Sequence, residues 1–199
     1  MASDLFCCER LQPDLRKAEK DPVIFLDSRV LPNLLNLEKQ YIPNCDYFSV
    51  VQYDIKPFMR KVVATWMLEL GLEDQVFPLA VNYLDRFLCS CNINKKHLQL
   101  AASVCIMLAS KIRQCQYVSM ETLCFYSDHS ITSQQIKDWE VLVLSKLRWN
   151  IAAVTGFDYI DHIIDRVPWG TENSLIRRHA TTLVGICYTG RRAFFLGGN

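Results

Sequence analysis

Charged residues recur on helix faces that are otherwise apolar, and this pattern constrains the fold more than any other feature of the chain. Asp85, Lys111 and Glu140 each fall within a run of apolar residues at helical spacing. Charges rarely stay in such places unless they pair inside the fold or meet a partner. The pattern therefore indicates an interaction surface rather than a reaction centre. The apolar residues on the three faces are Phe77, Val81, Leu84 and Leu88, then Leu100, Val104, Met107 and Leu108, and last Ile136, Val143, Leu144 and Leu147.

Helical periodicity runs along most of the chain, and no stretch alternates in the way typical of a strand. We therefore predict an all-α fold. A leading helix is expected over residues 27–42, with Asp27 or Ser28 as its cap. Short links then join five helices into a closed unit, and these helices are expected at residues 57–70, 74–89, 95–112, 120–127 and 133–147.

The composition limits the classes of partner. Half of the 199 residues are apolar, 22% are charged, and the formal net charge is +1. No field of one sign exists to attract nucleic acid or a membrane surface. The longest apolar stretch, residues 100–109, is too short to cross a bilayer, and the polar residues 2–14 predict no secretory leader. We expect neither a nucleic-acid partner nor a membrane.

The residue types that carry chemistry are scattered. Nine cysteines occur without a C-x-x-C pair, which is typical of a reduced intracellular protein. The histidines are isolated, and Cys89 and Cys91 with the nearby His97 do not have the spacing of a zinc site. No phosphate-binding loop or hydrolase motif is present. The sequence therefore predicts no catalytic residues, no metal and no cofactor.

Several separate blocks of the sequence resemble the cyclin box in its D-type, or G1, form. The resemblance implies repeats of five helices, with a complete first repeat and its leading helix over residues 23–152. It fades near residue 189, so residues 153–199 are expected to form an incomplete second repeat and a divergent tail. The blocks are M-R-K-V-V-A-T-W-M-L-E from Met59, F-P-L-A-V-N-Y-L-D-R-F-L from Phe77, L-Q-L from Leu98, A-S-K from Ala109 and K-L-R-W-N from Lys146.

The resemblance also implies roles for particular residues. Lys111, Glu140 and Leu100 match residues that contact a cyclin-dependent kinase. Arg60 and Asp85 match an internal ion pair. A docking patch for R-x-L peptides of substrates and kinase inhibitors is implied at Met59, Val62, Val63, Trp66, Glu69 and Gln99. Helical spacing independently places the four apolar members of this patch on one stripe.

A second motif lies in residues 1–22, a segment that we expect to be mobile. Leu5, Cys7 and Glu9 read as L-x-C-x-E. In an extended peptide these alternate side chains share one side while the backbone bonds a partner. In D-type cyclins this motif recognises pocket proteins of the retinoblastoma family. Such a protein is therefore an implied partner, together with a G1 cyclin-dependent kinase.

Other interpretations stay open. Lys111 also suits the last turn of a helix, where a cation complements the helix dipole. Glu140 can pair with Lys137 or Lys146, and a stripe such as that of Met59 and Trp66 is more often core than groove.

The expected function is that of a non-catalytic subunit, in the nucleus and cytoplasm, that activates a G1 kinase, recruits retinoblastoma-family substrate and promotes the G1/S transition. The alternatives are a truncated form that binds the kinase without activating it, a transcription-factor module with the same fold, and an enzyme with a Cys–His pair.

Overall fold

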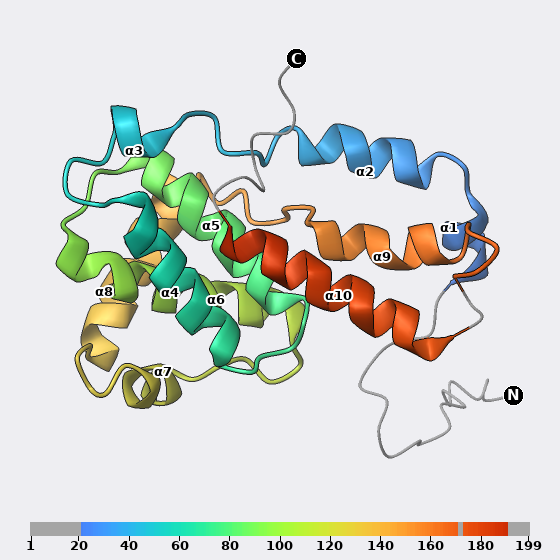
Figure 1. Cartoon of the computed structure of the whole chain (residues 1–199). Helices are drawn as coiled ribbons and strands as arrows, with labels where there is room; N and C mark the ends of the chain where they lie inside the picture. Colours follow the sequence, from blue (N-terminus) through green and yellow to red (C-terminus); the bar gives the residue numbers. More distant parts are fainter. Residues whose placement is uncertain (1–20, 171–172, 191–199) are drawn as a thin grey trace, which may run out of the picture.

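The structure, a computed structural model, describes residues 21–170 and 173–190, and every regular element within them is helical (Figure 1). The all-α prediction is therefore confirmed. The L-x-C-x-E residues Leu5, Cys7 and Glu9 lie outside the described residues. The helices are α1 (Pro22–Leu26), α2 (Val30–Glu38), α3 (Tyr47–Val50), α4 (Pro57–Glu69), α5 (Val76–Ser90), the short 3₁₀ helix η1 (Lys95–His97), α6 (Leu98–Arg113), α7 (Met120–Tyr126), α8 (Ser133–Lys146), α9 (Gly156–Ile164) and α10 (Ser174–Thr189).

The core is built around α5 and α6, which pack against each other, while α4 and α8 pack against α6. Residues 76–85 of α5 and 100–110 of α6 are buried without a break. A helix enclosed by neighbours in this way reads as apolar on every face. Within the described residues, no helix is both apolar enough and long enough to cross a membrane.

Local signals place the ends of several helices where the sequence predicted them. Pro57 opens α4, and Gly71, with a φ of 64°, follows its last turn. A left-handed φ costs glycine little, because it has no Cβ. A capping box at Thr132 and Gln135 starts α8. The predicted starts of these helices are confirmed.

The leading helix differs from the prediction. Asp27 does not begin a helix over residues 27–42 but ends α1, and its carboxylate accepts a hydrogen bond from the Arg29 backbone N–H at 2.8 Å. The next helix, α2, starts at Val30. The aspartate side chain holds the chain in a turn at this point, because it offers the backbone a partner outside the helix.

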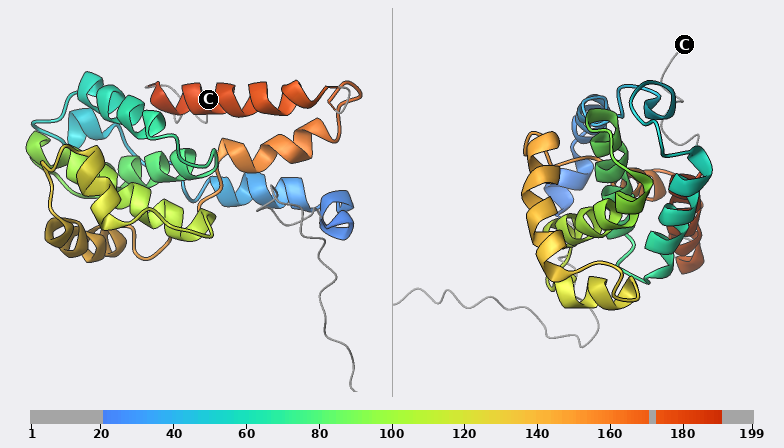
Figure 2. Two further views of the ribbon diagram at one scale, coloured as in Figure 1. Left: turned by 90° about the horizontal axis from the view of Figure 1, so that it is seen from below. Right: turned by 90° about the vertical axis from the view of Figure 1, so that its left-hand side faces the viewer.

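The last two helices extend to one side of the five-helix unit (Figure 2). α10 packs against α9 and also against α4 and α5 of that unit. α9 is tied to α6 by the Arg113–Asp158 ion pair, whose Nη1 and Oδ1 atoms lie 2.7 Å apart. The same aspartate closes a capping box with Thr155 at the start of α9.

Candidate functional site

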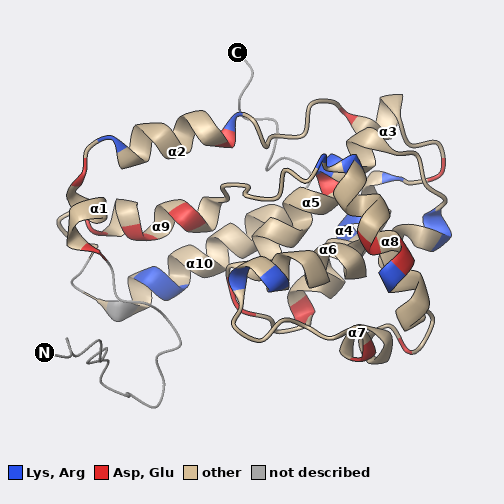
Figure 3. Cartoon of the chain, turned by 180° about the vertical axis from the view of Figure 1, so that it is seen from behind, with Lys and Arg blue, Asp and Glu red and all other residues tan. Residues whose placement is uncertain are grey.

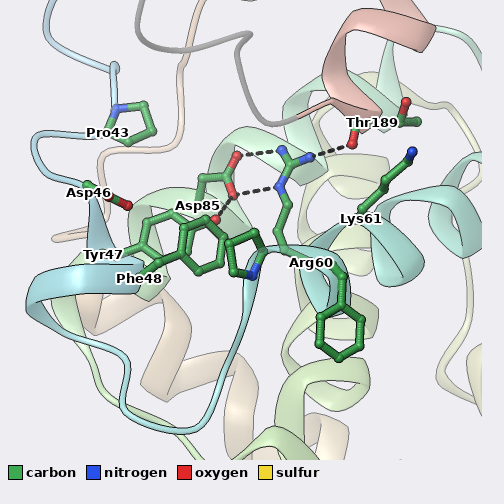
Figure 4. A pocket seen from close by; sticks show the side chains of 10 residues that line it. Pro43, Asp46, Tyr47, Phe48, Arg60, Lys61, Asp85 and Thr189 are labelled. Atoms are coloured by element: carbon green, nitrogen blue, oxygen red, sulfur yellow. Dashed lines mark hydrogen bonds and ion pairs between the residues drawn. The ribbon is translucent and has the colours of Figure 1, made fainter.

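Arg60 of α4 and Asp85 of α5 form a buried ion pair. Arg60 Nη2 lies 2.7 Å from Asp85 Oδ2, and Arg60 Nε lies 3.1 Å from Asp85 Oδ1. Their side chains are only 4% and 2% exposed. Tyr47 donates its hydroxyl proton to Asp85 Oδ1 at 2.6 Å, so the carboxylate has partners on both oxygens (Figure 4). Such saturation is what makes a buried charge pair tolerable.

Electrostatics favours the charged pair and a neutral phenol. Burial raises the pKa of Tyr47, and the neighbouring Asp85 carboxylate raises it further, so the hydroxyl keeps its proton and remains a donor. Burial works against the charge on Arg60, but attraction to Asp85 outweighs it and the pKa of Arg60 is raised. The site therefore holds the charged Arg60 guanidinium and a neutral Tyr47 hydroxyl.

Arg60 also reaches the end of α10. Its Nη1 donates to the carbonyl oxygens of Tyr188, Thr189 and Gly190 at 2.7, 3.1 and 3.3 Å. The last carbonyls of a helix lack partners within the helix, and a cation there also complements the helix dipole. No local pattern predicts this contact, since Arg60 and Tyr188 are 128 residues apart.

A cavity of about 180 Å³ lies beside this network. Figure 4 shows Tyr47 and Phe48 from α3 on one side, with Arg60 and Lys61 from α4 on the other. Its walls are Pro43, Asp46, Tyr47, Phe48, Pro57, Phe58, Arg60, Lys61, Asp85 and Thr189.

Lys111 and Glu140, the two residues expected to contact a kinase, pair with each other. Lys111 Nζ at the end of α6 lies 2.5 Å from Glu140 Oε1 in α8. The side chains are 34% and 20% exposed, so water and a partner both have access to them. Lys111 Nζ also lies 5.5 Å from the centre of the Tyr117 ring. Neither Lys137 nor Lys146 is the partner of Glu140 in this ion pair.

Leu100 requires a correction. It was expected on a partner-facing surface, but it is only 2% exposed and belongs to the core. The reason is the position of α6, which α4, α5 and α8 cover. Its apolar stripe with Val104 and Met107 therefore faces the inside of the protein.

The six residues of the expected docking patch lie on α4 and at the start of α6, two helices that pack together. Val62 is 63% exposed, and Glu69 is exposed as well. Met59, Val63 and Trp66 are half-buried and pack against the core, while their remaining surface meets solvent. Trp66 Nε1 donates to the Tyr126 carbonyl at 3.3 Å. Gln99 accepts from the Ser130 hydroxyl at 3.4 Å, so the end of α7 and the turn after it border the patch.

The chemistry that these residues offer is recognition. In the described part of the chain, no group of three or more His, Cys, Asp or Glu residues is placed to hold a metal ion. Figure 3 shows basic and acidic positions interspersed along the helices rather than gathered into one field. Accessible charges and a half-buried apolar stripe are features of a protein-binding surface.

Comparisons with known proteins agree with this description. Residues 29–152 match the family described as "Cyclin, N-terminal domain". The chain is 49% identical over 191 residues to G1/S-specific cyclin-D2 of Xenopus laevis and 44% identical over 191 residues to G1/S-specific cyclin-D3 of Homo sapiens. Each alignment covers 94% of this chain and 65% of the relative, so the chain spans just under two thirds of the length of these relatives.

The fold has a counterpart among solved structures. A viral cyclin from herpesvirus saimiri superposes with a TM-score of 0.73 at 25% identity, covering 84% of this chain and 75% of the viral one. The family match, the identities and the five-helix unit lead to the same conclusion. The chain belongs to the cyclin family and is similar to its D-type members.

Proposed function

We propose that this chain is a non-catalytic regulatory subunit that binds a G1 cyclin-dependent kinase and favours its active conformation. Cyclins are regulatory partners of kinases rather than enzymes, and the relatives carry the description G1/S-specific. The observation that carries the proposal is the Lys111–Glu140 pair, which is accessible and sits on the firmly packed α6 and α8. We expect the protein to act in the nucleus and the cytoplasm.

The mechanism requires no chemistry in this subunit. A partner that binds one kinase conformation better than the other shifts the equilibrium by the difference in affinity. Lys111 and Glu140 present a positive and a negative group side by side, and a kinase surface with the reversed order would fix the register. The buried residues 100–110 hold these charges in place, so little ordering cost is added on binding.

Substrate recruitment would use separate surfaces. The exposed Val62 and the half-buried Trp66 offer apolar contact for an R-x-L peptide, and Glu69 offers a partner for its arginine. The L-x-C-x-E motif at Leu5, Cys7 and Glu9 would add a site for a retinoblastoma-family pocket protein. Holding substrate and kinase on one subunit raises the effective concentration of the substrate.

A charge exchange tests the proposal. The double variant Lys111→Glu with Glu140→Lys keeps an ion pair within the protein but reverses its direction at the surface. Each variant would be co-expressed with a G1 kinase, captured, and assayed on a retinoblastoma-protein fragment. We expect the double variant to keep its thermal stability and to lose both capture and activity.

The matched control is Lys146→Glu, which changes an exposed lysine of the same helix, α8, and should leave capture unchanged. Capture of the double variant at the wild-type level would refute the assignment of the kinase contact. Capture of the wild type without phosphorylation of the fragment would mean that the chain binds the kinase but does not activate it.

A further inference from the structure

Residues 41–52, which contain α3 and form part of the connection between α2 and α4, lie along α5 and are attached to it near both ends. The Asn82 side chain donates to the Tyr41 carbonyl at 2.8 Å. At the other end, Gln52 donates to the Leu88 carbonyl at 2.7 Å. Two hydrogen bonds at separate points fix the position of this segment along α5.

Two cysteines, Cys45 and Cys89, are in contact near the Gln52 end of this stretch. Cys89, near the end of α5, directs its Sγ to the backbone carbonyl of Cys45 at 3.7 Å. Both are free thiols, and both are half-buried rather than sealed in the core. The Tyr47–Asp85 hydrogen bond lies one helical turn away and joins the same two segments. Cys45 therefore stays opposite Cys89.

The Cys45 thiol also affects the ionisation of Cys89. Burial and, after it, contact with the Cys45 thiol together raise the pKa of Cys89 to about 12. Cys89 therefore keeps its proton at neutral pH, which makes it slow to react with an oxidant on its own. Cys91 has a different orientation, because its thiol points to the neighbouring Asn92 carbonyl at 3.8 Å.

We propose that Cys45 and Cys89 form a redox-sensitive pair that a peroxide converts into a disulfide. The Cys45 sulfur attacks one peroxide oxygen, the O–O bond breaks, an S–O bond forms and one water leaves. The Cys89 sulfur then attacks the Cys45 sulfur, forming the S–S bond, while the oxygen leaves with the Cys89 proton as a second water. In total, two thiols lose two hydrogens and one peroxide is reduced to two waters.

The disulfide would close a loop between residues 44 positions apart. Asp46 and Tyr47, which line the cavity beside Arg60, directly follow Cys45, so the disulfide would add a covalent link to the existing Tyr47–Asp85 hydrogen bond. A cross-link of this length restricts the unfolded chain and stabilises the fold. The site is independent of the proposed kinase contact, since Lys111 and Glu140 lie on other helices.

The test uses the whole purified chain, reduced and then exposed to hydrogen peroxide. Proteolysis without reductant should release a peptide in which Cys45 is joined to Cys89, lighter by two hydrogens than its separate halves. Dithiothreitol should reduce this cross-link and release the two separate peptides. The thermal midpoint of the oxidised protein should rise by several degrees.

Variants separate this pair from the other thiols. Cys91→Ser, at the end of the same helix, should retain both the linked peptide and the rise in midpoint. Cys45→Ser and Cys89→Ser should abolish both, with circular dichroism showing that each variant is folded. The proposal is overturned if the wild type yields no Cys45–Cys89 peptide, if Cys89 joins Cys91 instead, or if Cys45→Ser shows the same rise.

Discussion

The protein contains two ion pairs with similar distances and different environments. The charged atoms of Arg60 and Asp85 lie 2.7 Å apart, and those of Lys111 and Glu140 lie 2.5 Å apart. The first pair is 4% and 2% exposed, whereas the second is 34% and 20% exposed. Distance therefore does not separate a structural pair from one available to a partner, but burial and the number of other bonds do.

The two ion pairs also differ in the other bonds that their cations make. Arg60 is bonded to Asp85 and to the end of α10, so its removal would leave a buried carboxylate and several carbonyls without a donor. Lys111 has water within reach and an aromatic ring nearby. A buried charge that loses its partner is costly, while an exposed pair contributes little to stability because water replaces the partner.

The largest expected effect is that of Asp85→Asn. It preserves shape but leaves the buried Arg60 guanidinium without its counter-charge, so the free energy of unfolding should fall by about 3–5 kcal/mol. Urea denaturation measures this change. In a double-mutant cycle with Arg60→Met, the loss for the pair should be smaller than the sum of the single losses. Additive losses would mean that the two charges do not stabilise each other.

Asp158→Ala should have the next largest effect, because Asp158 has two roles. It pairs with Arg113 and accepts a hydrogen bond from the Thr155 backbone N–H at 2.7 Å. We expect a loss of about 2 kcal/mol, the sum of a helix cap and a half-buried ion pair. The control is Asp161→Ala, which removes a more exposed ion pair, with Arg177, that does not cap a helix. Equal losses of stability for the two variants would show that the helix cap makes no measurable contribution.

Tyr47→Phe tests the support of the buried pair while leaving its charges intact. The variant deletes one hydroxyl that donates to Asp85. The free energy of unfolding should fall by about 1 kcal/mol, because Arg60 still satisfies both carboxylate oxygens. Tyr53→Phe is the control, since Tyr53 is 80% exposed. A loss as large as that of Asp85→Asn would show that the phenol, rather than the arginine, holds the carboxylate in place.

The smallest effect on stability is expected for Lys111→Met. The aliphatic part of the side chain is kept, and the pair that it breaks is accessible to water, so the change should be below about 1 kcal/mol. Kinase capture should fall far more than stability does. A stability loss comparable to that of Asp85→Asn would abolish the distinction between the two ion pairs.

The sequence predicted the parts of the fold that depend on local signals. The helix starts expected at residues 57 and 133 are correct, because Pro57 and the Thr132 capping box act within one turn of the helix. Asp27 misled the prediction, since an aspartate serves equally well at a turn between helices.

The contacts of the candidate site were less accessible to prediction. The sequence showed that Lys111 and Glu140 interrupt apolar faces, but not that they meet each other across two helices. Leu100 was assigned to the surface although α6 is enclosed. Both facts depend on how distant helices pack, and a single sequence contains no direct record of that packing.

Arg60 leaves the ribosome 128 residues before Tyr188, whose carbonyl it finally binds. At ordinary synthesis rates this interval lasts roughly ten seconds. Asp85 follows Arg60 by only 25 residues, so we expect the charge of Arg60 to be matched before α10 is made. α10 then supplies the carbonyl acceptors for Arg60 Nη1. We therefore expect the chain to assemble from its N-terminal helices towards α10.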